Sequence, residues 1–119
     1  MRIKTTIVFS LIASLGLVSP SFAADEDAGT DGRSLAFDRK KGNCLACHAI
    51  PSEPKAESPG NIGPPLVNMK ERYPDLAILR AQIWDATQTN PDSVMPPFGK
   101  NKILTEQELD LVTEFIQSL

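Results

Sequence analysis

The chain has 119 residues, with 12 Lys and Arg against 15 Asp and Glu, so its formal net charge is −3. Removal of the first 23 residues takes away two basic side chains and no acidic one, which leaves ten basic against fifteen acidic residues and a charge of −5. We do not expect an acidic chain of this kind to bind nucleic acid, because the phosphate backbone attracts basic surfaces.

Residues 1–23 have the organisation of a secretory signal peptide. Two basic residues precede an apolar run from Thr5 to Val18, and the small residues Ser21 and Ala23 predict cleavage after Ala23, with cleavage after Ala24 as the near alternative. An uncleaved anchor would need about 18 or more apolar residues to cross a bilayer, and this run is shorter. The sequence therefore predicts a periplasmic protein without a stable membrane anchor.

The residues after the leader are enough for one small domain, whose core alone would be marginally stable. Residues 24–32, ADEDAGTDG, contain no apolar side chain larger than alanine, so we expect an acidic, flexible lead-in. From Arg33 the pattern RSLAFDRKK predicts a short helix that ends at Gly42, where a left-handed cap costs least. The folded domain is accordingly placed at residues 33–119.

A long loop follows, because five prolines and two glycines rule out regular structure from Ile50 to about Leu66. Loops of that length in a small domain usually surround something functional or are disordered. A bulky cofactor next to this loop would give it a group to wrap.

Two further helices are expected. The first opens at Tyr73 with Pro74 in its first turn and has an apolar face through Ala86, and a second irregular stretch follows it. The last helix begins with a capping box made by Thr105 and Glu108. Its expected buried stripe consists of Leu109, Val112, Phe115, Ile116 and Leu119. The sequence thus predicts an all-α fold of three or four short helices joined by proline-rich loops.

Residues 44–48, CLACH, form a complete C-x-x-C-H motif. Two thiols three residues apart can reach the two vinyl groups of one haem, and the next residue then lies under the iron. Cys44 and Cys47 are therefore predicted to attach one haem c covalently, with His48 as an axial ligand of the iron.

Other uses of this motif fit the sequence less well. A zinc site would need two more Cys or His ligands, and the chain has no other cysteine or histidine. A thioredoxin-like dithiol would need a strand before it and a βαβ pattern around it, and no such pattern is present. If both sulfurs become thioethers, no free thiol is left in the chain.

The second axial ligand is expected to be a methionine, because His48 is the only histidine. Met1 belongs to the leader, which leaves Met69 and Met95 as candidates. Met95 lies in the stretch SVMPPF, where two prolines can fix the approach of its sulfur, whereas Met69 is part of the amphipathic stretch VNMKER, which is typical of a core residue. We therefore favour Met95 as the ligand.

The order C-x-x-C-H, Gly-Pro-x-Leu, Met-Pro and a capped final helix resembles the class I cytochromes c across the whole mature chain. In that family a proline carbonyl accepts a hydrogen bond from the proximal histidine. The resemblance therefore implies that Pro64 orients His48, that Leu66 contacts the haem, and that Phe37 of the first helix packs across the last helix.

A narrower resemblance is to the monohaem SoxX subunit of the SoxAX thiosulfate-oxidising cytochromes. It is carried by KKGNCLACH, GNIGPPL and NPDSVMPPFGKNKILTEQEL, in that order. The resemblance implies a heterodimer with SoxA, which holds the catalytic centre of an L-cysteine S-thiosulfotransferase. It also implies electron transfer from thiosulfate conjugation on the SoxY carrier to a soluble cytochrome acceptor.

Two other functions stay open from sequence alone. A free-standing class I shuttle that feeds an oxidase or reductase would share the same motifs. A haem sensor or peroxidase would need an open or exchangeable sixth position on the iron, and rapid binding of carbon monoxide would reveal it.

Overall fold

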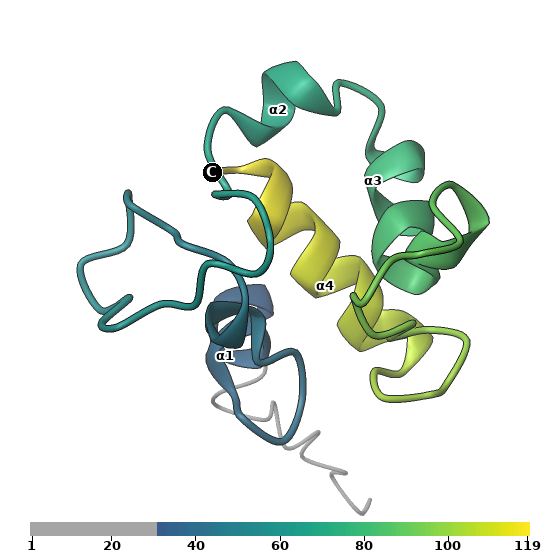
Figure 1. The fold of residues 1–119 in the computed structure, drawn as a ribbon, viewed down its shortest axis with the longest axis horizontal. Coiled ribbons are helices and arrows are strands. Elements are labelled where there is room, and N and C mark those ends of the chain that lie inside the picture. Colours follow the sequence, from purple (N-terminus) through teal and green to yellow (C-terminus); the bar gives the residue numbers. More distant parts are fainter. Residues whose placement is uncertain (1–30) are drawn as a thin grey trace, which may run out of the picture.

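A computed structural model describes residues 31–119, and all regular structure in that range is helical (Figure 1). The α-helices are α1 (Gly32–Phe37), α2 (Met69–Arg72), α3 (Leu76–Trp84) and α4 (Glu106–Gln117), and two short 3₁₀ helices are η1 (Cys44–Ala46) and η2 (Ala86–Gln88). The all-α prediction is confirmed. The expected signal peptide and most of the lead-in lie outside the described residues.

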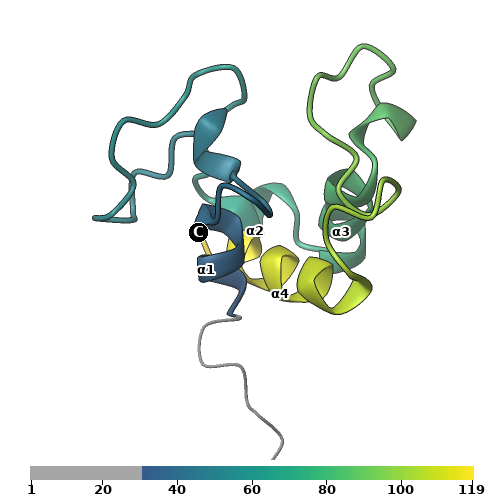
Figure 2. The ribbon, with the colours of Figure 1, turned by 90° about the horizontal axis from the view of Figure 1, so that it is seen from below.

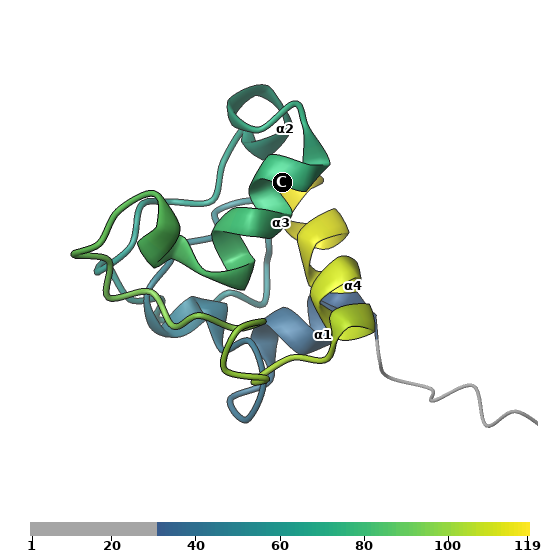
Figure 3. The ribbon, with the colours of Figure 1, turned by 90° about the vertical axis from the view of Figure 1, so that its right-hand side faces the viewer.

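The longest helix within residues 31–119, α4, is the element on which α1, α2 and α3 pack. It begins as the sequence predicted: the Thr105 side chain accepts from the N–H of Glu108, and the Glu108 carboxylate accepts from the N–H of Thr105. Both α1 and α3 pack against it (Figure 3). Leu109, Val112 and Ile116 of its expected stripe are buried, and Phe115 and Leu119 are partly buried.

The first helix crosses α4 at close range. A Cβ at Gly32 would overlap the backbone carbonyl of Leu111, so only glycine permits this approach. Phe37 and Phe115 meet with their ring centroids 6.3 Å apart and their planes tilted by 54°. The contact between Phe37 and the last helix that the resemblance implied is therefore present.

The boundaries of α1 correct the sequence analysis at both ends. Asp31, placed in the flexible lead-in, is the N-cap and accepts from the N–H of Ser34 at 2.6 Å. The helix ends at Phe37 and not at Gly42, because Asp38 accepts from the N–H of Lys40 with its side chain and so starts a turn.

The middle helix also begins later than expected. Asp75 is its N-cap and accepts from the N–H of Ala77 at 2.8 Å, so Pro74 precedes the helix instead of lying in its first turn. The buried face of α3 consists of Leu79 and Ile83, while Leu76 at its first position is 36% exposed. The short helix α2 had not been predicted.

Two long loops rise on the same side of the helical base, one before α2 and one between α3 and α4 (Figure 2). The first spans residues 47–68 and the second spans residues 89–105. Within residues 31–119, no helix is both long and apolar enough to cross a bilayer.

Candidate functional site

A cavity of about 740 Å³ lies between the two loops and above the helices, within the range of about 300–1,000 Å³ that holds small molecules and cofactors. Much of the hydrophobic core forms its walls. The buried core residues that line it are Leu66, Met69, Leu79, Ile83, Phe98, Leu104, Val112 and Ile116. An empty space of this size inside a core would be costly, so the walls are suited to a large apolar occupant.

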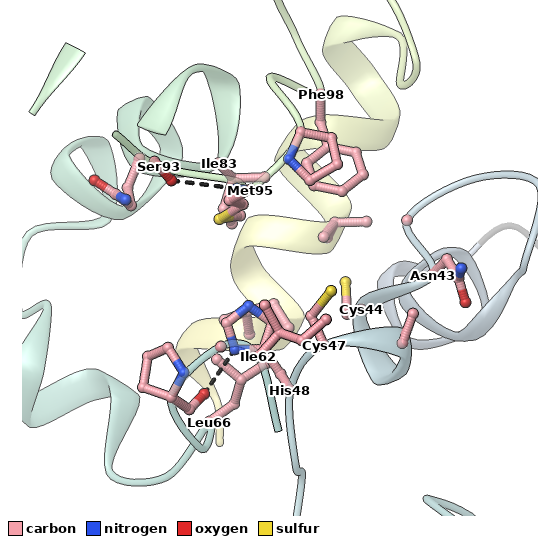
Figure 4. Close-up of a pocket in the computed structure, with 18 of the residues that line it drawn as sticks. Asn43, Cys44, Cys47, His48, Ile62, Leu66, Ile83, Ser93, Met95 and Phe98 are labelled. Carbon is pink, nitrogen blue, oxygen red and sulfur yellow. Dashed lines mark hydrogen bonds between the residues drawn. The ribbon is translucent and has the colours of Figure 1, made fainter. Parts of the chain in front are cut away.

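One edge of the cavity is formed by the C-x-x-C-H segment. Asn43 adopts a left-handed conformation (φ 48°), and η1 then closes with hydrogen bonds from the N–H groups of Cys47 and His48 to the carbonyl of Cys44. This tight turn places both sulfurs beside the His48 ring at the cavity (Figure 4). The sequence spacing is thus converted into one compact group of two thiols and an imidazole.

The orientation of the His48 ring is set by the loop that follows it. Nδ1 of His48 lies 2.6 Å from the carbonyl oxygen of Pro64, which is the contact that the class I resemblance implied. Because a carbonyl only accepts, Nδ1 carries the proton, and Nε2 keeps a free lone pair. The ring is therefore prepared to bind a metal through Nε2, and the hydrogen bond at Nδ1 holds it in that orientation.

Gly63 makes this arrangement possible, although the sequence analysis gave it no role. Its N–H donates to the carbonyl of Cys47 at 2.8 Å, which brings the loop against the histidine ring. A Cβ at this position would overlap the ring atoms of His48. The pair Gly63-Pro64 was the available signal, since glycine before a contact residue often marks a close backbone approach.

The opposite wall carries Met95. Its sulfur faces the His48 ring across the cavity (Figure 4). Its N–H donates to Oγ of Ser93 at 3.3 Å, and Pro96 and Pro97 follow it, so the backbone around it is restricted. Imidazole and thioether thus approach one space from two sides.

Met69 is placed differently, although it also lines the cavity. Its side chain is 2% exposed in the core, and Nη1 of Arg72 lies 3.2 Å from its sulfur. This sulfur already accepts a hydrogen bond from a guanidinium. The position agrees with the interpretation of Met69 as a core residue.

The protonation of Cys44 and the groups around both cysteines bear on whether they could serve as a redox dithiol or hold zinc. Burial raises the pKa of the Cys44 thiol to about 11, so this thiol is protonated at neutral pH and is a poor nucleophile or metal ligand when free. Among residues 31–119 no group of three or more Cys, His, Asp or Glu side chains is arranged to hold a metal ion. The described residues offer no zinc cluster around Cys44 and Cys47.

The residues around the cavity fit a haem c. They supply two thiols at one edge, an imidazole nitrogen from one side, a thioether sulfur from the other, and apolar walls between them. This is the donor set that proteins use for a six-coordinate haem iron with histidine and methionine ligands.

Comparison with protein families agrees with this donor set. The sequence model of the Cytochrome c family matches residues 30–119, and the chain therefore belongs to the cytochrome c family. Members of that family carry covalently bound haem c, and the helical fold of residues 31–119 is that of a class I cytochrome c.

Within that family the chain is a SoxX-like cytochrome. A chain in the crystal structure of SoxXA from P. pantotrophus has the same fold, with a TM-score of 0.67 and 28% sequence identity, over 76% of this chain and 80% of that chain. The resemblance to SoxX found in the sequence is thereby confirmed.

A relative of unknown activity shares part of the sequence. An uncharacterized lipoprotein of Aquifex aeolicus (strain VF5) is 32% identical over 77 residues, which are 65% of this chain and 36% of that protein. The chain thus spans little more than a third of the length of this relative.

Proposed function

We propose that the chain holds one haem c through Cys44 and Cys47, with His48 and Met95 as axial ligands of its iron. The observation that carries the proposal is the position of the His48 ring and the Met95 sulfur on opposite sides of one apolar cavity, with both cysteines at its edge. Pro64 orients His48, and Leu66 lines the wall beside it.

The proposed role is the transfer of single electrons. When bound, the haem supplies an iron that changes between its ferric and ferrous states. Two protein ligands leave no open position for oxygen or a substrate, and a thioether ligand raises the reduction potential. The apolar walls keep water away from the iron, which also favours a high potential.

The proposed physiological setting is a SoxAX-type complex. In this proposal the chain pairs with SoxA, accepts the electrons released when thiosulfate is joined oxidatively to a cysteine of the SoxY carrier, and passes them one at a time to a soluble cytochrome c. Support comes from the fold shared with SoxXA and from the cysteine count, because both cysteines are used for haem attachment. As a subunit of the thiosulfotransferase, the chain would leave the bond-forming step to SoxA.

We further propose a periplasmic location, with residues 1–23 as the cleaved leader. Support comes from the composition of these residues and from the similarity to a lipoprotein, a class of protein that is exported.

The test uses the purified haem protein, the SoxA and SoxY proteins of the same source, and thiosulfate. Reduction of this haem, followed by its α-band absorbance, should require both partners and should disappear when the carrier cysteine of SoxY is replaced. A chain that does not associate with SoxA and stays oxidised in the complete mixture would instead be a free-standing class I shuttle.

A further inference from the structure

The loop that carries Met95 makes few backbone hydrogen bonds near the methionine itself, whose side chain packs against the hydrophobic core. The N–H of Met95 donates to the Ser93 hydroxyl, and the next two residues, Pro96 and Pro97, have no N–H to donate. Val94 is 78% exposed. The position of the Met95 sulfur therefore also depends on how the two sides of the loop are held together.

Backbone hydrogen bonds join the end of α3 to residues 99–100 of the loop, and we call this junction of residues 84–85 and 99–100 the neck. The carbonyl oxygen of Trp84, the last residue of α3, accepts from the N–H groups of Gly99 (3.2 Å) and Lys100 (3.3 Å). A Cβ at Gly99 would overlap the indole ring of Trp84, so the two sides of the neck are in direct contact. The neck brings positions 84 and 100 together while Met95 lies within the loop.

An ion pair between a buried carboxylate and a half-exposed lysine reinforces this neck. The Asp85 side chain is fully buried, and its Oδ2 lies 2.9 Å from Nζ of Lys100. Thr87 donates to Oδ1 through both its N–H and its hydroxyl, and Gln88 donates to Oδ2 through its amide. Asp85 therefore binds η2, which precedes the loop, and Lys100, which lies within the loop, at the same time.

We propose that the ion pair between Asp85 and Lys100 is a latch that keeps Met95 on the iron, so that Asp85 is a positioning residue for this axial ligand. The inference rests on the proposed ligation by Met95. With the neck closed, the thioether is confined to the segment of residues 85–99, which keeps its effective concentration at the iron high. Loss of Lys100 leaves a buried carboxylate without its cation, a strongly unfavourable state that opening of the neck would relieve.

The experiment measures how easily an external ligand displaces Met95. The ferric holoprotein is mixed with imidazole, and the rate and extent of binding are followed by the loss of the absorption due to methionine-to-iron charge transfer. The variants are Asp85→Asn, Lys100→Met and the double variant. We expect each single variant to bind imidazole on the order of tenfold faster and more tightly, which lies within the range of coupling energies for contacting residues. The effect of the double variant on imidazole binding should be smaller than the sum of the two single effects.

Two controls separate the latch from general effects. Lys102→Met removes the same charge from an exposed residue two positions away, and it should bind imidazole as the unchanged protein does. Arg80→Gln breaks the ion pairs from α3 to Glu106 and Asp110 on α4, and it should lower the unfolding temperature without changing imidazole binding. If the pair of Asp85 and Lys100 only stabilised the fold, Asp85→Asn would behave as Arg80→Gln does. Its unfolding temperature would fall and its imidazole binding would stay unchanged.

Met95→Ala is the reference variant, because it separates failure of the latch from failure of the proposed ligation. If this variant loses the charge-transfer absorption while Asp85→Asn and Lys100→Met bind imidazole at the unchanged rate, the latch is refuted and Met95 remains the ligand. If Met95→Ala keeps the absorption, the assignment of Met95 as ligand fails, and the latch fails with it.

Discussion

Nδ1 of His48 and the carbonyl oxygen of Pro64 lie 2.6 Å apart, and this contact decides which ring nitrogen is free. Since the carbonyl cannot donate, the proton stays on Nδ1 and the lone pair stays on Nε2. Gly63, one residue before Pro64, packs on the ring itself. One short segment thus determines both the tautomer and the orientation of the proposed proximal ligand.

Replacement of Gly63 by alanine tests the steric part of this relationship. The added Cβ would overlap the His48 ring, so the ring must turn and its hydrogen bond to Pro64 must break. We expect a reduced yield of haem-loaded protein and a mixed-spin ferric spectrum in the protein that forms. Asn61→Ala, an exposed position in the same loop, is the matched control and should leave yield and spectrum unchanged.

Replacement of the two candidate methionines separates the ligand from the core residue. Met95→Ala should abolish the charge-transfer absorption completely and lower the reduction potential, because a thioether ligand favours the ferrous state. Met69→Leu should keep both properties and lose at most about 1.5 kcal/mol of stability, as expected for a volume-conserving core change. Retention of the absorption in Met95→Ala together with its loss in Met69→Leu would reverse the assignment.

The capping box of α4 predicts a stability effect that is independent of the haem ligands. Thr105→Ala removes the acceptor for the N–H of Glu108 and should cost about 1 kcal/mol. For a domain of this size that corresponds to a fall of about 4–8 °C in the unfolding temperature. Gln107→Ala, at an exposed position in the same turn, should change the unfolding temperature by much less. Equal shifts in both variants would show that the hydrogen bond of the cap does not stabilise the domain.

Asp85 predicts a specific dependence of stability on pH. Its hydrogen bonds from Thr87, the Lys100 ammonium and the Gln88 amide hold the pKa of the Asp85 carboxyl well below its usual range. A lowered pKa in the folded state contributes stability that is present above the unfolded pKa and is lost as the pH falls through the folded value. The stability advantage over Asp85→Asn should therefore be full at neutral pH and should shrink progressively below about pH 4.

Thermal unfolding of the ferric protein and of Asp85→Asn, measured from pH 7 down to about pH 2, checks this dependence. A difference in unfolding temperature that stays constant over the whole range would contradict the lowered pKa of Asp85. Arg80→Gln serves as a comparison, since it disrupts a different set of ion pairs.

Several features of this chain were determined by sequence because they depend on residues that are close along the chain. The C-x-x-C-H motif needs only its own five residues to bring two thiols and an imidazole together. The capping box joins residues three positions apart, and it begins α4 at the predicted place. The prolines likewise forbid helix locally, which correctly placed both long loops.

Other features were decided by the tertiary structure because they join segments that are far apart. Contact with the ring of His48 requires glycine at position 63, and the burial of Asp85 makes Lys100 its partner fifteen residues later. The sequence showed neither relationship, since each residue taken alone is typical of a turn or a surface. Local patterns therefore identified the groups that can bind a haem, whereas the packing of distant loops set their orientation, because only packing can bring such groups to one cavity.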